Sequence, residues 1–140
     1  MSKLLLFLAI FILLVSANVD LTGFNVFSLN AGTPETTINV AKGELFALKI
    51  PSNPTTGFNW YVMNSAELKS SNILVALNLN GTTSGEYQKD DSPFGMVGVG
   101  GNAYFKFQGV NSGSSTIRLD YMRIWEHAPI NSLMVKVEVA

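Results

Sequence analysis

Apolar and polar residues alternate along most of this chain, and that pattern constrains the fold more than any other feature. The alternation is clearest at 46–50, 103–108, 117–121 and 133–139. A repeat of two turns successive side chains to opposite faces of an extended strand, so each segment has one face suited to a core. Further strands are expected within 21–29, 36–40, 59–63 and 73–79, the last of them as a buried strand.

Clusters of glycine, proline, asparagine and serine separate these segments and indicate turns. They fall at 41–43, 51–57, 80–85 and 111–115. Only 65–71 favours a helix, of one turn at most. Many short strands between regular turn signals predict an all-β fold, and we expect an antiparallel β-sandwich of the immunoglobulin-like type.

The first 17 residues have the pattern of a cleaved signal peptide. Lys3 gives a basic start, residues 4–15 are uninterruptedly apolar, and Val15-Ser16-Ala17 offers small residues for cleavage. The apolar run is shorter than the roughly 20 residues that a helix needs to cross a bilayer, which disfavours a signal anchor. The basic start and terminal position disfavour a buried core helix. We therefore expect cleavage after Ala17, one domain over 18–140, and a protein that enters the secretory pathway and is secreted or kept in a lysosomal or vesicular lumen.

Composition excludes several classes of function. The chain has no cysteine, so a disulfide, a thiol nucleophile and a Cys-based zinc site are excluded, and the hydrophobic core must hold the fold. Loss of Lys3 with the leader leaves eight basic residues against ten acidic ones, a net charge of −2 that argues against a nucleic-acid partner. The single histidine, His127, lies beside Glu126 without the further groups of a catalytic or metal site. We expect no enzymatic activity, no metal and no cofactor.

The first loop, Asn53-Pro54-Thr55-Thr56-Gly57-Phe58, has an unusual combination of restrictions. The proline restricts itself and the preceding asparagine, the two threonines are stiff at χ1, and the glycine permits a positive φ. Such a loop would be a narrow, preorganised wedge that loses little entropy on entering a cleft. An ordinary Pro/Gly turn is the alternative interpretation.

The second loop, residues 90–101, ends in Gly98-Val99-Gly100-Gly101. Dense glycines leave backbone N–H and C=O groups uncovered, free to pair with another protein. A phosphate-binding loop would lead into a helix, whereas these glycines lead into the alternating segment 103–108, so nucleotide binding is excluded. A plain flexible connector is the alternative.

The third loop, residues 123–129, contains Arg123-Ile124-Trp125 and lies between the last two alternating segments. Arginine and tryptophan are the residue types that most often dominate binding energy at interfaces. Alternatively, Trp125 could cover the end of the core and Arg123 could be a solvated cation.

Taken in order, the three loops resemble those of the chagasin family of cysteine peptidase inhibitors. That family carries Asn-Pro-Thr-Thr-Gly-Phe/Tyr, then Gly-x-Gly-Gly, then Arg/Lys-Pro-Trp; Tyr121-Met122-Arg123 ahead of the tryptophan is also similar to the family. The resemblance extends over about 36–140 and implies an immunoglobulin-like sandwich with the three loops clustered at one end.

The resemblance also implies how the loops act. The first loop would enter the active-site cleft of a papain-like cysteine peptidase, cathepsin L-like or similar, with Thr55 nearest the target's catalytic cysteine. Residues 98–101 of the second loop, and Arg123 with Trp125 of the third, would grip the walls of the cleft. Inhibition would be tight, reversible and free of chemistry, and the inhibitor would act as a monomer, with no membrane partner after cleavage.

One position departs from the family pattern. Ile124 stands where the family has proline. Because isoleucine does not fix φ, we expect Trp125 to be less preorganised, and either binding to be weaker or the preference among peptidases to differ.

Three further expectations are independent of the resemblance. An adhesion or carbohydrate-binding sandwich is the alternative function, in which Trp125, Tyr87 and Tyr104 would be exposed and stack on sugars. Asn80-Gly81-Thr82 is a glycosylation sequon on an expected turn, and 18–33 is either an edge strand or a loose arm.

Overall fold

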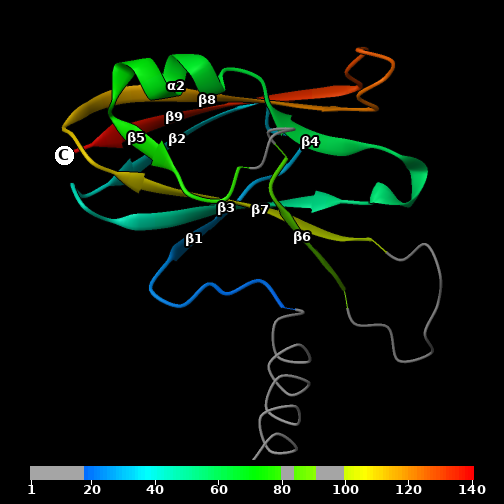
Figure 1. Cartoon of the computed structure of the whole chain (residues 1–140), viewed down its shortest axis with the longest axis horizontal. Helices are drawn as coiled ribbons and strands as arrows, with labels where there is room; N and C mark the ends of the chain where they lie inside the picture. Colours follow the sequence, from blue (N-terminus) through cyan, green and yellow to red (C-terminus); the bar gives the residue numbers. More distant parts are fainter. Residues whose placement is uncertain (1–17, 80–83, 91–99) are drawn as a thin grey trace, which may run out of the picture.

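The computed structural model describes residues 18–79, 84–90 and 100–140, and shows two β-sheets packed face to face (Figure 1). The expected signal peptide, the sequon at Asn80, and Gly98 and Val99 of the second loop lie outside the described residues. None of the described helices is both long and apolar enough to cross a membrane.

The first sheet has five strands, centred on a long antiparallel pair. β3 (Leu45–Ser52) pairs with β7 (Gly101–Gly109), from Leu45 opposite Gln108 to Ser52 opposite Gly101. β1 (Asn25–Ser28) adds to β3, while β5 (Leu74–Ala76) and β6 (Glu86–Lys89) both pair with β7. The segment 18–33 therefore contains an edge strand.

The second sheet has four strands in the order β2-β9-β8-β4. These are β2 (Glu35–Val40), β9 (Asn131–Val139), β8 (Gly113–Met122) and β4 (Asn59–Val62). The predicted sandwich is confirmed. Two edge pairs, β1 with β3 and β2 with β9, run parallel, a detail that alternation cannot predict because its period is two in either direction.

The core lies between the sheets and consists largely of the residues that the alternation selected, with Leu68 of the helix added to them. Phe46, Leu48 and Ile50 of β3 and Ile117 and Leu119 of β8 are fully buried. Each such side chain contributes about 1.5–3 kcal/mol when it leaves water, so a core built from many of them can hold the fold without disulfides.

The prediction from the sequence was partly wrong for the region that follows β4. The helix α2 (Ser65–Ser71) has seven residues, about two turns rather than one, and buries Leu68. The strand expected within 73–79 forms, but its expected burial is wrong: β5 has three residues at a sheet edge, and Val75 and Leu77 are 39% and 45% exposed. β6 was not predicted, because its sequence EYQK is polar.

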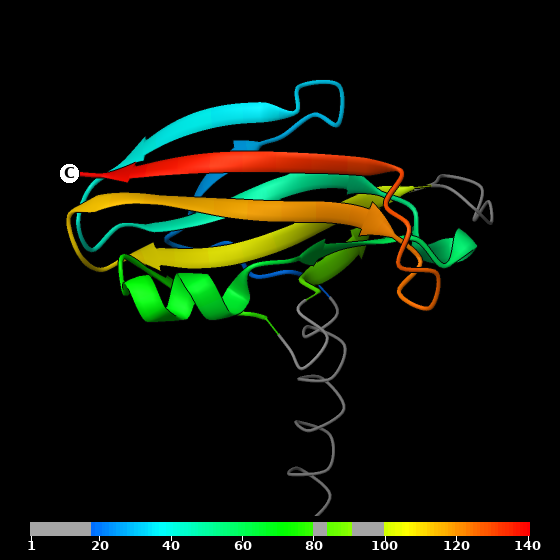
Figure 2. The ribbon, with the colours of Figure 1, turned by 90° about the horizontal axis from the view of Figure 1, so that it is seen from above.

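Two features of the register bring the binding loops together. Ser52 at the end of β3 is opposite Gly101 at the start of β7, and Asn59 at the start of β4 is opposite Met122 at the end of β8. The first loop and the third loop therefore leave the sandwich at the same end, as Figure 2 shows.

Candidate binding surface at one end of the sandwich

The first loop is a hydrogen-bonded turn. Pro54–Thr56 form one turn of 3₁₀-helix, closed by the Gly57 N–H donating to the Pro54 carbonyl at 2.9 Å, with Gly57 at a φ of 84°. The Thr55 hydroxyl donates to Asn53 Oδ1 at 2.6 Å, and the Thr56 hydroxyl donates to the Asn53 carbonyl at 3.2 Å. Both threonines are exposed, so the loop presents small side chains on a backbone that is already ordered.

Two aromatic side chains from the strands, Trp60 and Tyr121, pack with Phe58 of the loop itself. Trp60 is 2% exposed, and its Nε1 donates to the Pro51 carbonyl at 3.0 Å. The ring of Tyr121 lies 5.0 Å from that of Trp60 and 5.5 Å from that of Phe58, which it stacks against. The Asn53 N–H donates to the Tyr121 hydroxyl at 3.4 Å. The sequence singled out Tyr121 as a strand residue that resembles the family, but not as a support of the first loop.

Arg123 connects the third loop to the first. Its Nε donates to the Thr56 carbonyl at 2.9 Å, and its guanidinium carbon lies 4.5 Å from the centre of the Phe58 ring. Its Nη1 lies 3.4 Å from Glu126 Oε1. Arg123 is therefore more than the solvated cation of the alternative interpretation, because its guanidinium contacts the protein although the side chain remains 36% exposed.

Trp125 lies on the surface and packs against the first loop. It is 66% exposed, so it does not cover the end of the core. A Cβ added to Gly57 would lie 2.6 Å from Cη2 of Trp125, which places the indole directly on that glycine. The indole thus packs in a defined position against Gly57, although Ile124 rather than proline precedes Trp125.

A hydrogen-bonded turn shapes the third loop. The Glu126 N–H donates to the Arg123 carbonyl at 3.0 Å, which makes Ile124 the second residue of a four-residue turn. The Ile130 N–H donates to the Tyr121 carbonyl at 2.9 Å and closes the loop at its base. His127 is exposed with a φ of 52°, and the described residues contain no cluster of His, Cys, Asp and Glu that could hold a metal.

The described part of the second loop lies beside the first. A Cβ added to Gly100 would lie 3.4 Å from the Ser52 carbonyl oxygen and 3.9 Å from Asn53 Cβ, and the Gly100 carbonyl accepts a hydrogen bond from the Asp90 N–H at 3.1 Å. A Cβ on Gly101 would lie 2.2 Å from the Gln88 carbonyl oxygen, so the close approach of β6 to β7 requires glycine there. The structure thus brings Gly100, Gly101 and the first and third loops to one end.

One ionisable group beside the second loop, the Tyr87 phenol, has a clearly raised pKa. Burial raises the pKa of the Tyr87 phenol, and the nearby Asp90 carboxylate and Tyr121 phenol raise it further. Tyr87 is only partly exposed and Tyr104 is 7% exposed. The carbohydrate-binding alternative expects Trp125, Tyr87 and Tyr104 all to be exposed. That expectation is wrong for Tyr104, which is buried, and Tyr87 is only partly exposed.

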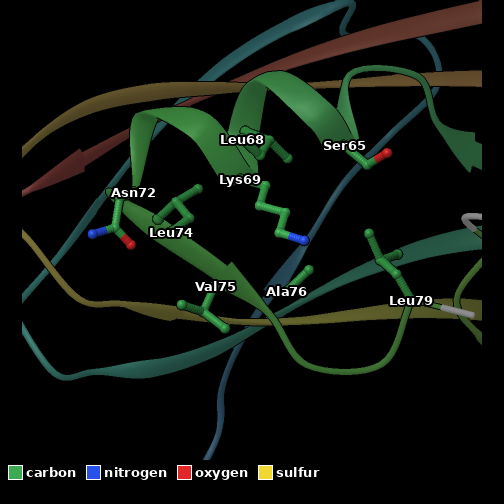
Figure 3. A pocket seen from close by; sticks show the side chains of 8 residues that line it. All are labelled: Ser65, Leu68, Lys69, Asn72, Leu74, Val75, Ala76 and Leu79. Carbon is green, nitrogen blue, oxygen red and sulfur yellow. The ribbon is translucent and has the colours of Figure 1, made fainter.

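A groove of about 390 Å³ lies away from these loops, between α2 and β5 (Figure 3). Leu68, Leu74, Val75 and Leu79 make it largely apolar, and Lys69 reaches across it. Its lining includes no carboxylate, histidine or other group with an evident chemical role. It is separate from the surface that the three loops form.

Comparison with known proteins agrees with this arrangement. The family model described as Chagasin family peptidase inhibitor I42 matches residues 39–139. Amoebiasin-1 of Entamoeba histolytica is 34% identical over 113 residues, which cover 80% of this chain and 98% of the relative. Chagasin of Trypanosoma cruzi is 34% identical over 89 residues, which cover 64% of this chain and 74% of the relative.

A solved structure supports the fold. The crystal structure of a cysteine protease inhibitor from Entamoeba histolytica superimposes with a TM-score of 0.62 at 21% identity, covering 82% of this chain and 96% of that one. The resemblance seen in the sequence is confirmed, as is the expectation that the chain is an inhibitor rather than an enzyme. On the match over 39–139 and the similarity to amoebiasin-1, the chain belongs to the chagasin family of cysteine peptidase inhibitors.

Proposed function

We propose that this chain inhibits papain-like cysteine peptidases, cathepsin L-like enzymes among them, by inserting the first loop into the active-site cleft. The observation that carries the proposal is the state of that loop in the free protein. Thr55 is exposed at its tip, while the backbone behind it is held by the 2.9 Å hydrogen bond from Gly57 to Pro54. A loop ordered before binding loses little entropy in a cleft, which favours tight binding.

The flanking elements have separate roles in this proposal. Thr55 lies nearest the target's cysteine, and its small side chain leaves room for close approach. Trp125, 66% exposed, covers one wall of the cleft, and the glycines at 98–101 cover the other with backbone groups. Binding is reversible because the inhibitor donates no group to chemistry and only denies access to the cysteine.

The same proposal includes the route and the state of the protein. The leader 1–17 directs the chain into the secretory pathway, and the inhibitor acts as a monomer on peptidases in the lumen of vesicles or outside the cell. Expression with its own leader in a secreting host, followed by intact-mass measurement, should give a chain that begins at Asn18.

A titration tests the function itself. Purified protein is added in steps to an active-site-titrated papain-like peptidase, and residual activity is measured against a small peptide substrate. We expect a linear, stoichiometric loss of activity, with the added protein intact on a gel after hours. Undiminished activity at micromolar inhibitor, or cleavage of the inhibitor in step with recovery of activity, contradicts the proposal.

A further inference from the structure

We infer that Arg123 is a positioning residue, which holds the first loop in its binding geometry instead of meeting the peptidase as a charge. This inference rests on the proposed function. Sequence reasoning placed Arg123 with Trp125 on the wall of the cleft, but the two side chains differ in their surroundings. Trp125 is 66% exposed, whereas the Arg123 side chain is 36% exposed and its guanidinium contacts Thr56, Phe58 and Glu126 of its own chain.

The hydrogen bond to Thr56 satisfies an acceptor that the loop itself leaves open. Thr56 is the last residue of the 3₁₀ turn, and the carbonyls at the end of a helix have no partner within it. Arg123 Nε donates to that oxygen at 2.9 Å. A donor from a charged group makes a stronger hydrogen bond than a neutral one, so this contact fixes the end of the turn.

The same guanidinium also contacts Phe58, which follows Gly57 at the end of the first loop. Its carbon lies 4.5 Å from the centre of the Phe58 ring, within the range of a cation–π interaction. Phe58 also stacks on Tyr121, with the ring centres 5.5 Å apart and the planes at 24°. Arg123 and Tyr121 are two residues apart at the end of β8, and both contact the first loop.

The first loop is therefore held at both ends by one short segment. At its start, the Asn53 N–H donates to the Tyr121 hydroxyl, and at its end the Thr56 carbonyl accepts from Arg123. Between them lie Thr55 and the rest of the turn. The Glu126 carboxylate, 3.4 Å from Nη1 and partly exposed, adds only the small contribution of a surface ion pair.

Lysine at position 123 separates positioning from charge. It retains the positive charge, but it has neither the Nε donor nor the planar group that stacks on an aromatic ring. If Arg123 positions the loop, Arg123→Lys should loosen the loop and weaken inhibition although the charge is unchanged. If Arg123 instead meets an acidic group of the peptidase, lysine should substitute well.

Two measurements on Arg123→Lys decide between these roles. The first is the ¹H–¹⁵N heteronuclear NOE of Thr55, Thr56 and Gly57 in the free protein, which reports backbone motion on the ps–ns timescale. The second is the inhibition constant Ki with its association rate constant. We expect lower NOE values at these three residues, and Ki higher by about tenfold, mostly through slower association, because only the ordered fraction of loops can bind.

The matched control is Glu126→Gln, which removes the ion pair and leaves both Arg123 contacts with the first loop in place. Its NOE values should equal those of the original protein, and its Ki should change less than about threefold. The inference is overturned if Arg123→Lys inhibits as well as the original protein, or if it inhibits less well while the three NOE values are unchanged. Failure of the original protein to inhibit would contradict the proposed function instead, and the NOE values would still decide whether Arg123 orders the loop.

Discussion

The indole of Trp125 rests on the Cα of Gly57, so closely that a methyl group on the glycine would lie 2.6 Å from Cη2 of the tryptophan. The third loop and the tip of the first loop are thereby one surface rather than two. Glycine at 57 serves two purposes here. It adopts a φ of 84°, which residues with a Cβ rarely adopt, and its lack of a side chain leaves the space that the indole occupies.

Gly57→Ala should therefore damage inhibition more than stability. The left-handed backbone costs about 1–2 kcal/mol for a residue with a Cβ, and the methyl group also displaces Trp125 from its seat. We expect the free energy of unfolding in urea to fall by about that amount, and Ki to rise by roughly tenfold or more. Both follow from one purified variant, by urea titration and by inhibition kinetics.

Gly43→Ala is the control for the stability cost of placing a Cβ on a left-handed backbone. Gly43 has a φ of 88°, and a Cβ there would meet nothing within 4 Å. It should lose as much stability as Gly57→Ala and leave Ki unchanged. Equal effects of the two substitutions on Ki would mean that the contact between Gly57 and Trp125 does not matter for binding.

Trp125→Ala should weaken binding while leaving the fold as stable as before. Because the side chain is 66% exposed, its removal costs the folded protein little. Buried by a peptidase, a tryptophan is worth about 2 kcal/mol, or roughly a thirtyfold higher Ki. Ile130→Ala, at a residue 60% exposed just beyond the third loop, is the control and should change Ki by less than about threefold. A Trp125→Ala protein with unchanged Ki would exclude the indole from the interface.

Proline at position 124 should improve the inhibitor. Ile124 is the second residue of the turn closed by the hydrogen bond from Glu126 to Arg123, and proline is favoured there because its φ near −65° suits the turn. Fewer conformations in the unfolded chain should raise the free energy of unfolding by about 0.5 kcal/mol, and a stiffer loop should lower Ki about two- to threefold.

Ile124→Ala separates that effect from loss of the isoleucine side chain, which is 41% exposed. The alanine variant should keep the original Ki, since it leaves φ free. A proline variant less stable than the original would show that the turn does not accept proline's geometry, and that the preference of the family is not for stiffness at this position.

Much of the fold was predictable because burial here follows a period of two. Phe46, Leu48 and Ile50 could be assigned to a core from their spacing alone, and all three are fully buried. The spacing failed where strands are short or polar. β5 has an apolar sequence, yet Val75 is 39% exposed, because the strand lies at the sheet edge, and β6 forms from polar residues because β7 offers it a free edge.

The binding surface was predictable as three loops but not as a set of contacts. Each loop could be recognised in the sequence from its proline, glycine or tryptophan residues, because these residue types restrict the backbone or anchor a contact locally. That Arg123 would reach the Thr56 carbonyl, 67 residues away in the sequence, depends on the pairing of β4 with β8, which no local pattern encodes. For the same reason, a strand residue such as Tyr121 gave no sign that its hydroxyl would meet the Asn53 N–H.

Thr55→Arg is the substitution that most directly tests the position of the tip. Thr55 is exposed, so arginine fits the free protein, but a side chain of that length cannot enter a cleft that accepts threonine closely. We expect an inhibition constant at least about a hundredfold higher, with an unfolding free energy within about 1 kcal/mol of the original, since only the hydroxyl bond to Asn53 is lost. Thr55→Ser keeps that hydroxyl and should inhibit normally. Thr37→Arg, at an exposed threonine of β2, adds the same charge elsewhere and should also inhibit normally. If Thr55→Arg retains full inhibition, the tip of the first loop is not what enters the cleft.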